Sequence, residues 1–150
     1  MALTKEQIKE FKKAEKEAED FYDYRNVADD IAEANDKEWA QRIYKKAEGK
    51  AEDCSDFCGL AECIFENLDD KKWVKKIYKK WEEMAEDFSN FYNIADHILE
   101  NLGDKELVKK VYKKAEDKAE NCDDYESLAE SVRDNLGDKK WAKSLEKKAK

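Results

Sequence analysis

Apolar residues recur three and four positions apart along the chain, which is the spacing of one face of a helix. Near the N-terminus, Ile8, Phe11 and Ala14 share such a face, and Thr4 and Gln7 have the spacing of a capping box ahead of it. Charged residues fill the positions between the apolar ones. The pattern predicts an all-α protein whose helices have narrow apolar faces and wide solvated faces.

The helical pattern repeats, and four aspartates mark the repeat at intervals of 34 residues: Asp36, Asp70, Asp104 and Asp138. A first helix precedes each aspartate and a second helix follows it, at 21–34 and 37–52 in the first unit. Gly103 and Gly137 stand where a first helix ends, which suits a left-handed residue in a tight turn. The two helices of each unit are therefore expected to be antiparallel neighbours.

The same positions are apolar in every unit. The first helices are expected to bury Tyr24, Val27, Ala28 and Ile31, then Phe57, Leu60, Ala61 and Ile64, then Phe91, Ile94, Ala95 and Ile98, then Tyr125, Leu128, Ala129 and Val132. The second helices are expected to bury Trp39, Trp73, Leu107 and Trp141, with Tyr44, Tyr78 and Tyr112 further along. A helix–turn–helix period of this length predicts a solenoid, in which each unit buries its apolar faces against its neighbours.

The stretch FYNIADHILENLGDKELVKKVYKKAE resembles the tetratricopeptide repeat. Phe91, Ile94 and Ala95 match the aromatic, leucine and small positions of that family's first helix, and Tyr112 and Ala115 match its second helix. Two departures are the lack of a proline at the end of any repeat and a turn one residue longer in three of the four copies. The resemblance implies a right-handed α/α solenoid of tetratricopeptide-like helix pairs, with about nine helices.

The sequence predicts a single solenoid domain over residues 1–150. Its parts are a capping helix at 1–19 and four repeats at 20–52, 53–86, 87–120 and 121–150. The capping helix, FKKAEKEAED, is a shortened copy of the second helix YKKAEGKAED. In the last copy, Glu146 replaces the tyrosine that would pack against a following unit. Polar ends of this kind predict a complete array.

Composition narrows the choice of function class. The net charge of −8 argues against nonspecific binding of nucleic acid, and no apolar run is long enough to span a membrane. The N-terminus has no apolar stretch of the signal-peptide kind, which favours the cytoplasm. No phosphate loop and no nucleophile–histidine–acid set is present, so neither an enzyme nor a cofactor is expected.

Charge is segregated between the two helices of each unit. The first-helix segments (20–34, 53–66, 87–100, 121–134) hold 17 acidic residues against 2 basic ones, whereas the second-helix segments (37–50, 71–84, 105–118, 139–150) hold 8 acidic against 23 basic. In the tetratricopeptide family the first helices line the concave face. The resemblance therefore implies an acidic groove and a lysine-rich back.

Residues along the first helices are the candidate partner-binding set: Arg25, Asn26, Asp29, Glu33, Cys58, Glu62, Phe65, Glu66, Tyr92, Asn93, Asp96, Leu99, Glu100, Glu126, Glu130 and Arg133. Equivalent positions of the four copies form a column. Columns that are acidic in every copy add their electrostatic fields and attract a basic partner. The non-repeating members would supply specificity. Carboxylate-clamping relatives carry Lys and Asn in these columns, so a carboxylate clamp is not expected.

Three hypotheses of function remain open. The first is a protein–protein interaction module or adaptor that binds a basic peptide segment in the acidic groove. The second is a structural subunit, or an engineered or consensus-like scaffold without a ligand, in which the charges give solubility or pair internally; self-association is then left open. The third and weakest is a metal or small-molecule site centred on Cys58, Cys63 and His97.

Two further patterns have a plain structural interpretation. Cys54 and Cys122 occupy a position that is Phe in other copies, which favours reduced structural thiols over a disulfide or a metal site. Lysine pairs recur at 45–46, 79–80, 113–114 and 147–148 and are interpreted as a solvated outer face, with an anion-binding ridge as the alternative.

The placement of Trp73 in the core is testable. Trp73→Ala is expected to lower the free energy of unfolding by about 3–5 kcal/mol, because truncation of a buried Trp leaves a cavity. Urea titration measures the loss. A loss below about 1 kcal/mol, the size of a surface effect, would show that Trp73 is not a core residue.

Overall fold

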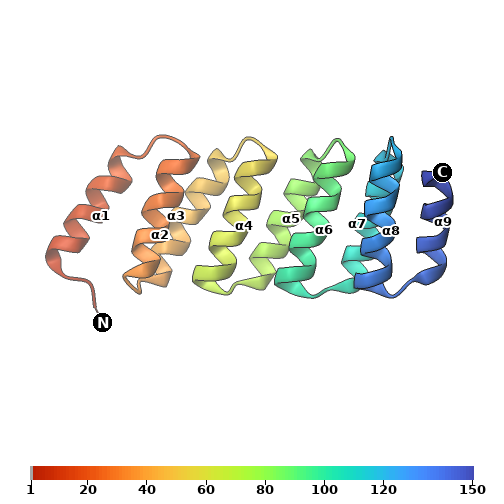
Figure 1. Cartoon of the computed structure of the whole chain (residues 1–150). Coiled ribbons are helices and arrows are strands. Elements are labelled where there is room, and N and C mark those ends of the chain that lie inside the picture. Colours follow the sequence, from red (N-terminus) through yellow and green to blue (C-terminus); the bar gives the residue numbers. More distant parts are fainter. Residues whose placement is uncertain (1) are drawn as a thin grey trace. The chain divides into compact units, whose positions relative to one another are not determined.

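The computed structural model describes residues 2–150, and over that range it contains nine α-helices and no strand (Figure 1). The helices are α1 (Lys5–Glu17), α2 (Phe21–Glu33), α3 (Lys37–Lys50), α4 (Cys54–Leu68), α5 (Lys71–Met84), α6 (Phe88–Leu102), α7 (Lys105–Lys118), α8 (Cys122–Leu136) and α9 (Lys139–Ala149). The predicted all-α fold of repeated helix pairs is confirmed. Met1, the first residue of the predicted capping segment, lies outside the described residues.

Helices that are consecutive in the chain pack against one another. Helices α2 and α3, α6 and α7, and α8 and α9 form tightly packed pairs, and α3 and α7 also contact the first helix of the following pair. The chain divides into two compact units, of which the first ends at Lys80 and the second begins at Trp81. Each unit is described by itself below.

The predicted apolar stripes form the core. Ala28, Ile31, Ile43 and Tyr44 are fully buried in the first unit, and the corresponding positions are buried in the second. Fully burying side chains of this size stabilises the fold by about 1.5–3 kcal/mol for each large one. Four residues differ from the expectation because they are only half-buried. They are Tyr24 and Tyr125, at the first turn of their helices, and Leu107 and Trp141 on the second helices.

Helix starts follow the sequence closely. Thr4 and Gln7 form the predicted capping box, and Asp36 accepts a hydrogen bond of 3.0 Å from the backbone N–H of Trp39. The same cap geometry begins the other helices, with Asp20, Asp53, Asp70, Asp87, Asp104, Asn121 and Asp138 as acceptors. Each such cap contributes about 1 kcal/mol relative to alanine.

The turn within each pair uses a left-handed residue. Gly103 and Gly137 have φ of 60° and 66°, as predicted. Asn35 and Asp69 take the same conformation in the first two copies, with φ of 68° and 50°. Left-handed backbone thus ends the first helix in all four copies, and it is glycine in only two of them.

A glutamate joins successive second helices, and we call this contact the glutamate clamp. Glu48 at the end of α3 accepts hydrogen bonds from the indole N–H of Trp73, at 2.8 Å, and from the ammonium group of Lys80. The same arrangement joins Glu15 to Trp39 and Lys46, and Glu116 to Trp141 and Lys148. Helix α1 therefore packs as a second helix would, as its sequence indicates.

The clamp also perturbs the titration of its glutamate. Burial opposes ionisation of Glu15, but hydrogen bonds from Lys46 and Trp39 outweigh it and hold the pKa of Glu15 below its usual value of 4.5. Because the folded-state pKa is lowered, the stability from this contact is present above pH 4.5. It is lost as the pH falls through the lowered pKa.

The third copy provides a natural comparison. Leu107 replaces the tryptophan there, so Glu82 pairs with Lys114 but has no indole N–H to bind. The side chains of Glu48 and Glu82 are equally exposed, at 15% each. The two clamps therefore differ mainly in the indole hydrogen bond.

Removing the two glutamates should separate the contribution of the indole. Glu48→Ala is expected to cost about 1–3 kcal/mol of unfolding free energy, because it leaves the N–H of Trp73 unpaired as well as breaking the lysine pair. Glu82→Ala breaks only a pair to an exposed lysine and should cost about 1 kcal/mol or less. Urea titration of both variants measures the difference, and equal losses would show that the indole bond contributes nothing.

Candidate functional site

The acidic residues of the first-helix segments fall into two groups. At least eight accept internal hydrogen bonds, as helix caps, in helix first turns or from other side chains: Asp20, Asp23, Asp29, Asp53, Asp56, Asp87, Asp96 and Asp124. The other nine are all exposed: Asp30, Glu33, Glu62, Glu66, Glu100, Asp123, Glu126, Glu130 and Asp134. Within the second group, Glu62 also accepts a hydrogen bond of 3.8 Å from the Cys58 thiol. Asp20, Asp23, Asp53 and Asp87 of the first group are exposed too, but their carboxylates are engaged at helix starts.

Asp29 belongs to a hydrogen-bonded network inside the first unit. The hydroxyl of Tyr44 and the amide of Asn67 both donate to Asp29 Oδ1, and Asn67 Nδ2 also donates to the Tyr44 hydroxyl at 2.7 Å. The Cys63 thiol lies 3.7 Å from the other carboxylate oxygen. These contacts link α2, α3 and α4, so Asp29 holds successive helices together.

The second unit repeats this network with changes. Tyr112 donates to Asp96 at 3.3 Å, and Asn135 donates to the Tyr112 hydroxyl at 2.9 Å. Tyr92 joins it from α6, with its hydroxyl 2.5 Å from that of Ser131 and its ring stacked on Tyr112. Tyr92 and Asp96, both candidate binding residues, thus take part in packing between α6, α7 and α8.

Burial perturbs the groups in these networks. It raises the pKa of Tyr112 to about 12, with the Asp96 charge acting in the same direction, and it raises the pKa of Tyr44 as well. It also raises the pKa of Asp96, to which Glu100 adds. Both tyrosines are therefore protonated donors at neutral pH, as the networks require.

Arg25 is half-buried on the face shared by α2 and α4. Its guanidinium lies over the ring of Tyr22, 5.3 Å from the ring centroid, and donates to the exposed Asn26. A side chain at Gly59 would come within 3.3 Å of the guanidinium. Glycine in the interior of α4 therefore makes room for Arg25.

The exposed acids form rows on single helices. Glu126, Glu130 and Asp134 follow one another at four-residue intervals along α8, which places them on one face. Glu62 and Glu66 do the same on α4, and Glu33 lies on the neighbouring α2. Of the remaining candidates, Asn93 and Glu100 are exposed, whereas Phe65 and Leu99 are half-buried.

Arg133 is paired within the second unit. Its guanidinium forms a salt bridge with Glu146, the residue that replaces the repeated tyrosine in the last copy. Both side chains remain more than 40% exposed. The arginine thus balances the charge introduced where the tyrosine is lost, and it is not a free cation on the α8 face.

The cysteines are not uniformly buried. Cys54, Cys58 and Cys63 are half-buried, but Cys122 is exposed although the equivalent Phe21 and Phe88 are buried. The short thiol side chain does not fill the place of a phenylalanine there. Burial, helped by nearby carboxylates, raises the pKa of Cys58 to about 11 and of Cys63 to about 12. Both are therefore protonated thiols at neutral pH.

The lysine pairs divide into two roles. The second lysine of each pair, at positions 46, 80, 114 and 148, binds the clamp glutamate of the preceding second helix. Among the first lysines, Lys45 places its ammonium group 5.9 Å from the centroid of the Trp73 ring. Sequence reasoning missed the clamp, although its glutamates recur at 15, 48, 82 and 116 with almost the same period.

Within residues 2–150, no helix combines the length and apolar character needed to cross a membrane. Comparison with known proteins gave no match: no family model, no curated protein and no solved structure matches this chain.

The tyrosine networks can be tested by removing single hydroxyl groups. Tyr44→Phe and Tyr112→Phe should each lower the free energy of unfolding by about 1–3 kcal/mol, because each leaves half-buried polar partners unsatisfied. The control is Tyr22→Phe, since Tyr22 is 50% exposed; its effect should stay within about 0.5 kcal/mol. If thermal and urea unfolding show all three variants alike, the networks do not stabilise the fold.

Proposed function

We propose that this protein is a protein–protein interaction module that binds a basic peptide segment on the exposed face of its first helices. One observation carries the proposal: eight acidic side chains of the first-helix segments are exposed and serve neither as caps, nor in the tyrosine networks, nor as the partner of the Cys58 thiol. They are Asp30, Glu33, Glu66, Glu100, Asp123, Glu126, Glu130 and Asp134. Acidic side chains that serve only the fold would be expected to have internal partners, as the clamp glutamates do.

The row Glu126, Glu130 and Asp134 on α8 supports the proposal most directly. Three carboxylates at four-residue intervals repel one another along the helix, so the row costs stability when no cation is near. Arg133 does not relieve the row, because it is paired with Glu146. A partner segment with Lys or Arg at matching intervals would neutralise the row, and its approach would be steered by the field.

The finer fold assignment belongs to the same proposal. The period of 34 residues and the packing of consecutive helices support a tetratricopeptide-like, right-handed solenoid whose first helices form the binding face. In that arrangement Glu33, Glu62 and Glu66 would provide the acidic surface of the first unit, and the α8 row that of the second. Tyr92, Asp29 and Asp96 would act indirectly, by holding the helices in position.

A scaffold without a specific ligand is the second candidate. The clamps and tyrosine networks account for several of the most regular columns, including the second lysine of each pair and the repeated asparagine at Asn67 and Asn135. Strict repetition of those residues is therefore explained by folding alone. The exposed acids would then serve solubility.

Peptide binding distinguishes the two candidates. The probe is a fluorescent peptide of about twelve residues with Lys or Arg at every fourth position, compared with its Glu-substituted counterpart. The basic peptide should bind at low salt and weaken strongly between about 20 and 300 mM salt, because screening shortens the reach of exposed charges. Fluorescence anisotropy measures both affinities.

Charge reversal locates the site. Glu130→Lys with Asp134→Lys should weaken binding of the basic peptide by about tenfold or more, since two attractive charges become repulsive. The matched control, Glu83→Lys with Asp117→Lys, changes the net charge equally at exposed positions of α5 and α7. If both double variants weaken binding equally, only net charge matters and the proposed face is not a site; if neither peptide binds, the scaffold is favoured.

A further inference from the structure

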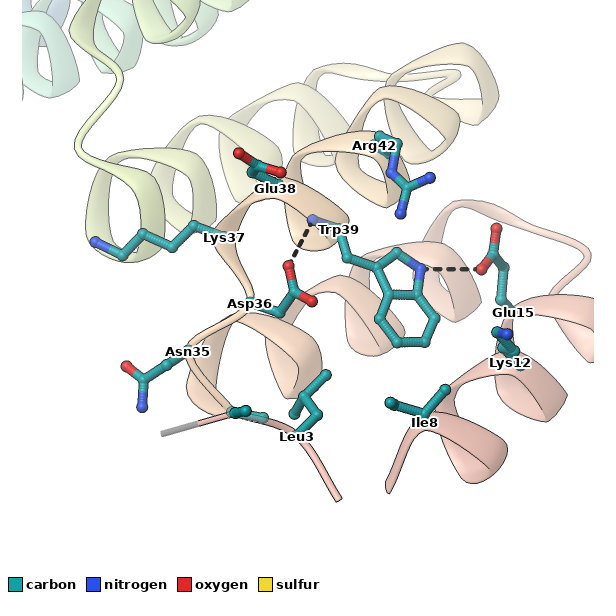
Figure 2. Close-up of a pocket in the computed structure, with 12 residues that line it drawn as sticks. Leu3, Ile8, Lys12, Glu15, Asn35, Asp36, Lys37, Glu38, Trp39 and Arg42 are labelled. Carbon is teal, nitrogen blue, oxygen red and sulfur yellow. Dashed lines mark hydrogen bonds between the residues drawn. The ribbon is translucent and has the colours of Figure 1, made fainter. Parts of the chain in front are cut away.

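A pocket of about 810 Å³ lies between α1 and the start of α3 (Figure 2). The indole of Trp39 forms one wall, and Leu3, Ile8 and Ala34 add apolar surface. Phe11 packs edge-on against the indole from α1, with ring centroids 5.9 Å apart. The pocket is therefore apolar at its base and is placed on a part of the first unit that the proposed peptide-binding face does not use.

The next junction shows why this space exists. The corresponding position between α3 and the start of α5 holds a pocket of only about 150 Å³, lined by Gln41, Leu68 and Asp70. Ala34 and Leu68 are equivalent, because each directly precedes the left-handed residue of its turn. The later copies keep leucine here, at 102 and 136. The first copy thus lacks the side chain that reduces this space elsewhere.

Only some of the charged side chains around the pocket have hydrogen-bond partners. Glu15 is bound by Trp39 and Lys46, and Asp36 caps α3. Within the described residues, Arg42 and Lys12 have no hydrogen bond or ion pair. Figure 2 shows Arg42 above the indole ring and Lys12 near Glu15, whereas Lys37 extends away from the ring. Glu38 also lines the pocket without a hydrogen bond in the described part of the chain, so the lining side chains that lack one are three cations, Lys12, Lys37 and Arg42, against one anion. The charge of Arg42 also acts on Glu15 and helps to lower its pKa.

We propose that this pocket binds a small organic anion with a flat apolar body, such as an aryl carboxylate. The apolar body lies against the indole of Trp39, and the carboxylate pairs with Arg42 and Lys12. Apolar walls with a few convergent polar groups are the usual composition of a small-molecule site. Phe11 packs edge-on against the indole and Glu15 binds its N–H, so the ring is fixed before a ligand arrives.

Three isosteric probes test the predicted chemistry: 2-naphthoate, the neutral 2-naphthamide and the cationic 2-naphthylmethylammonium. Isothermal titration calorimetry on the full chain should give one site for 2-naphthoate, with a Kd of about 1 mM or below for a ligand of this size. Affinity should fall from the anion to the amide to the cation. Equal affinities would overturn the charge assignment, and no binding of 2-naphthoate would overturn the site.

Two variants test whether the ligand binds in this pocket. Ala34→Leu introduces the side chain that the later copies carry and should abolish binding while the melting temperature stays the same or rises. Arg42→Glu should weaken 2-naphthoate by about tenfold, as expected when a pairing charge is reversed. Its matched control is Lys76→Glu at the equivalent position of α5, where the pocket is small.

The control variant must leave the affinity unchanged. If Lys76→Glu weakens binding as much as Arg42→Glu, the probe responds to overall charge and the site is wrong. If Ala34→Leu binds 2-naphthoate as tightly as the parent chain, the ligand does not enter this pocket. Basic-peptide binding, measured in parallel, should be unaffected by Ala34→Leu, which keeps the two proposals separate.

Discussion

The packing of successive helix pairs depends on aromatic side chains that bury a ring and must still pair a polar atom. Tryptophan brings an indole N–H and tyrosine a hydroxyl group, and each costs free energy if it is buried without a partner. The fold supplies Glu48 for Trp73 and Asp29 for Tyr44, and it repeats both solutions in later copies. Carboxylates are thus needed at fixed places where successive helices pack, and this need accounts for a small part of the acidic composition.

The acidic columns of the sequence consequently mix two kinds of residue. Asp29 and Asp96 share a column with Glu62 and Glu130, yet the first two bind tyrosine hydroxyls and the last two are exposed. Column position alone does not separate them, because the choice depends on which side chain the neighbouring helix presents. The exposed residues of each column are therefore the candidates for contact with a partner.

Local and periodic features were predictable from the sequence. Thr4, Asp36 and Gly103 act through contacts within a few residues, so caps and turns follow directly from residue type. The clamp was not predicted, because Glu48 and Lys80 are 32 residues apart and their pairing requires the packing of α5 on α3. The pocket beside Ala34 was missed for a related reason: a lost leucine is visible in the alignment of copies, but the space it leaves depends on α1.

The indole N–H groups of the clamps can report local unfolding between successive second helices. Trp39, Trp73 and Trp141 each hold a carboxylate from the preceding second helix through one indole N–H. Each of these three N–H protons lies at a different junction between successive second helices. Their NMR signals and exchange rates therefore report on each junction separately. Repeat proteins can open in stages, since each unit contacts only its neighbours. Hydrogen exchange at three indoles would therefore show which junction opens first, without any added label.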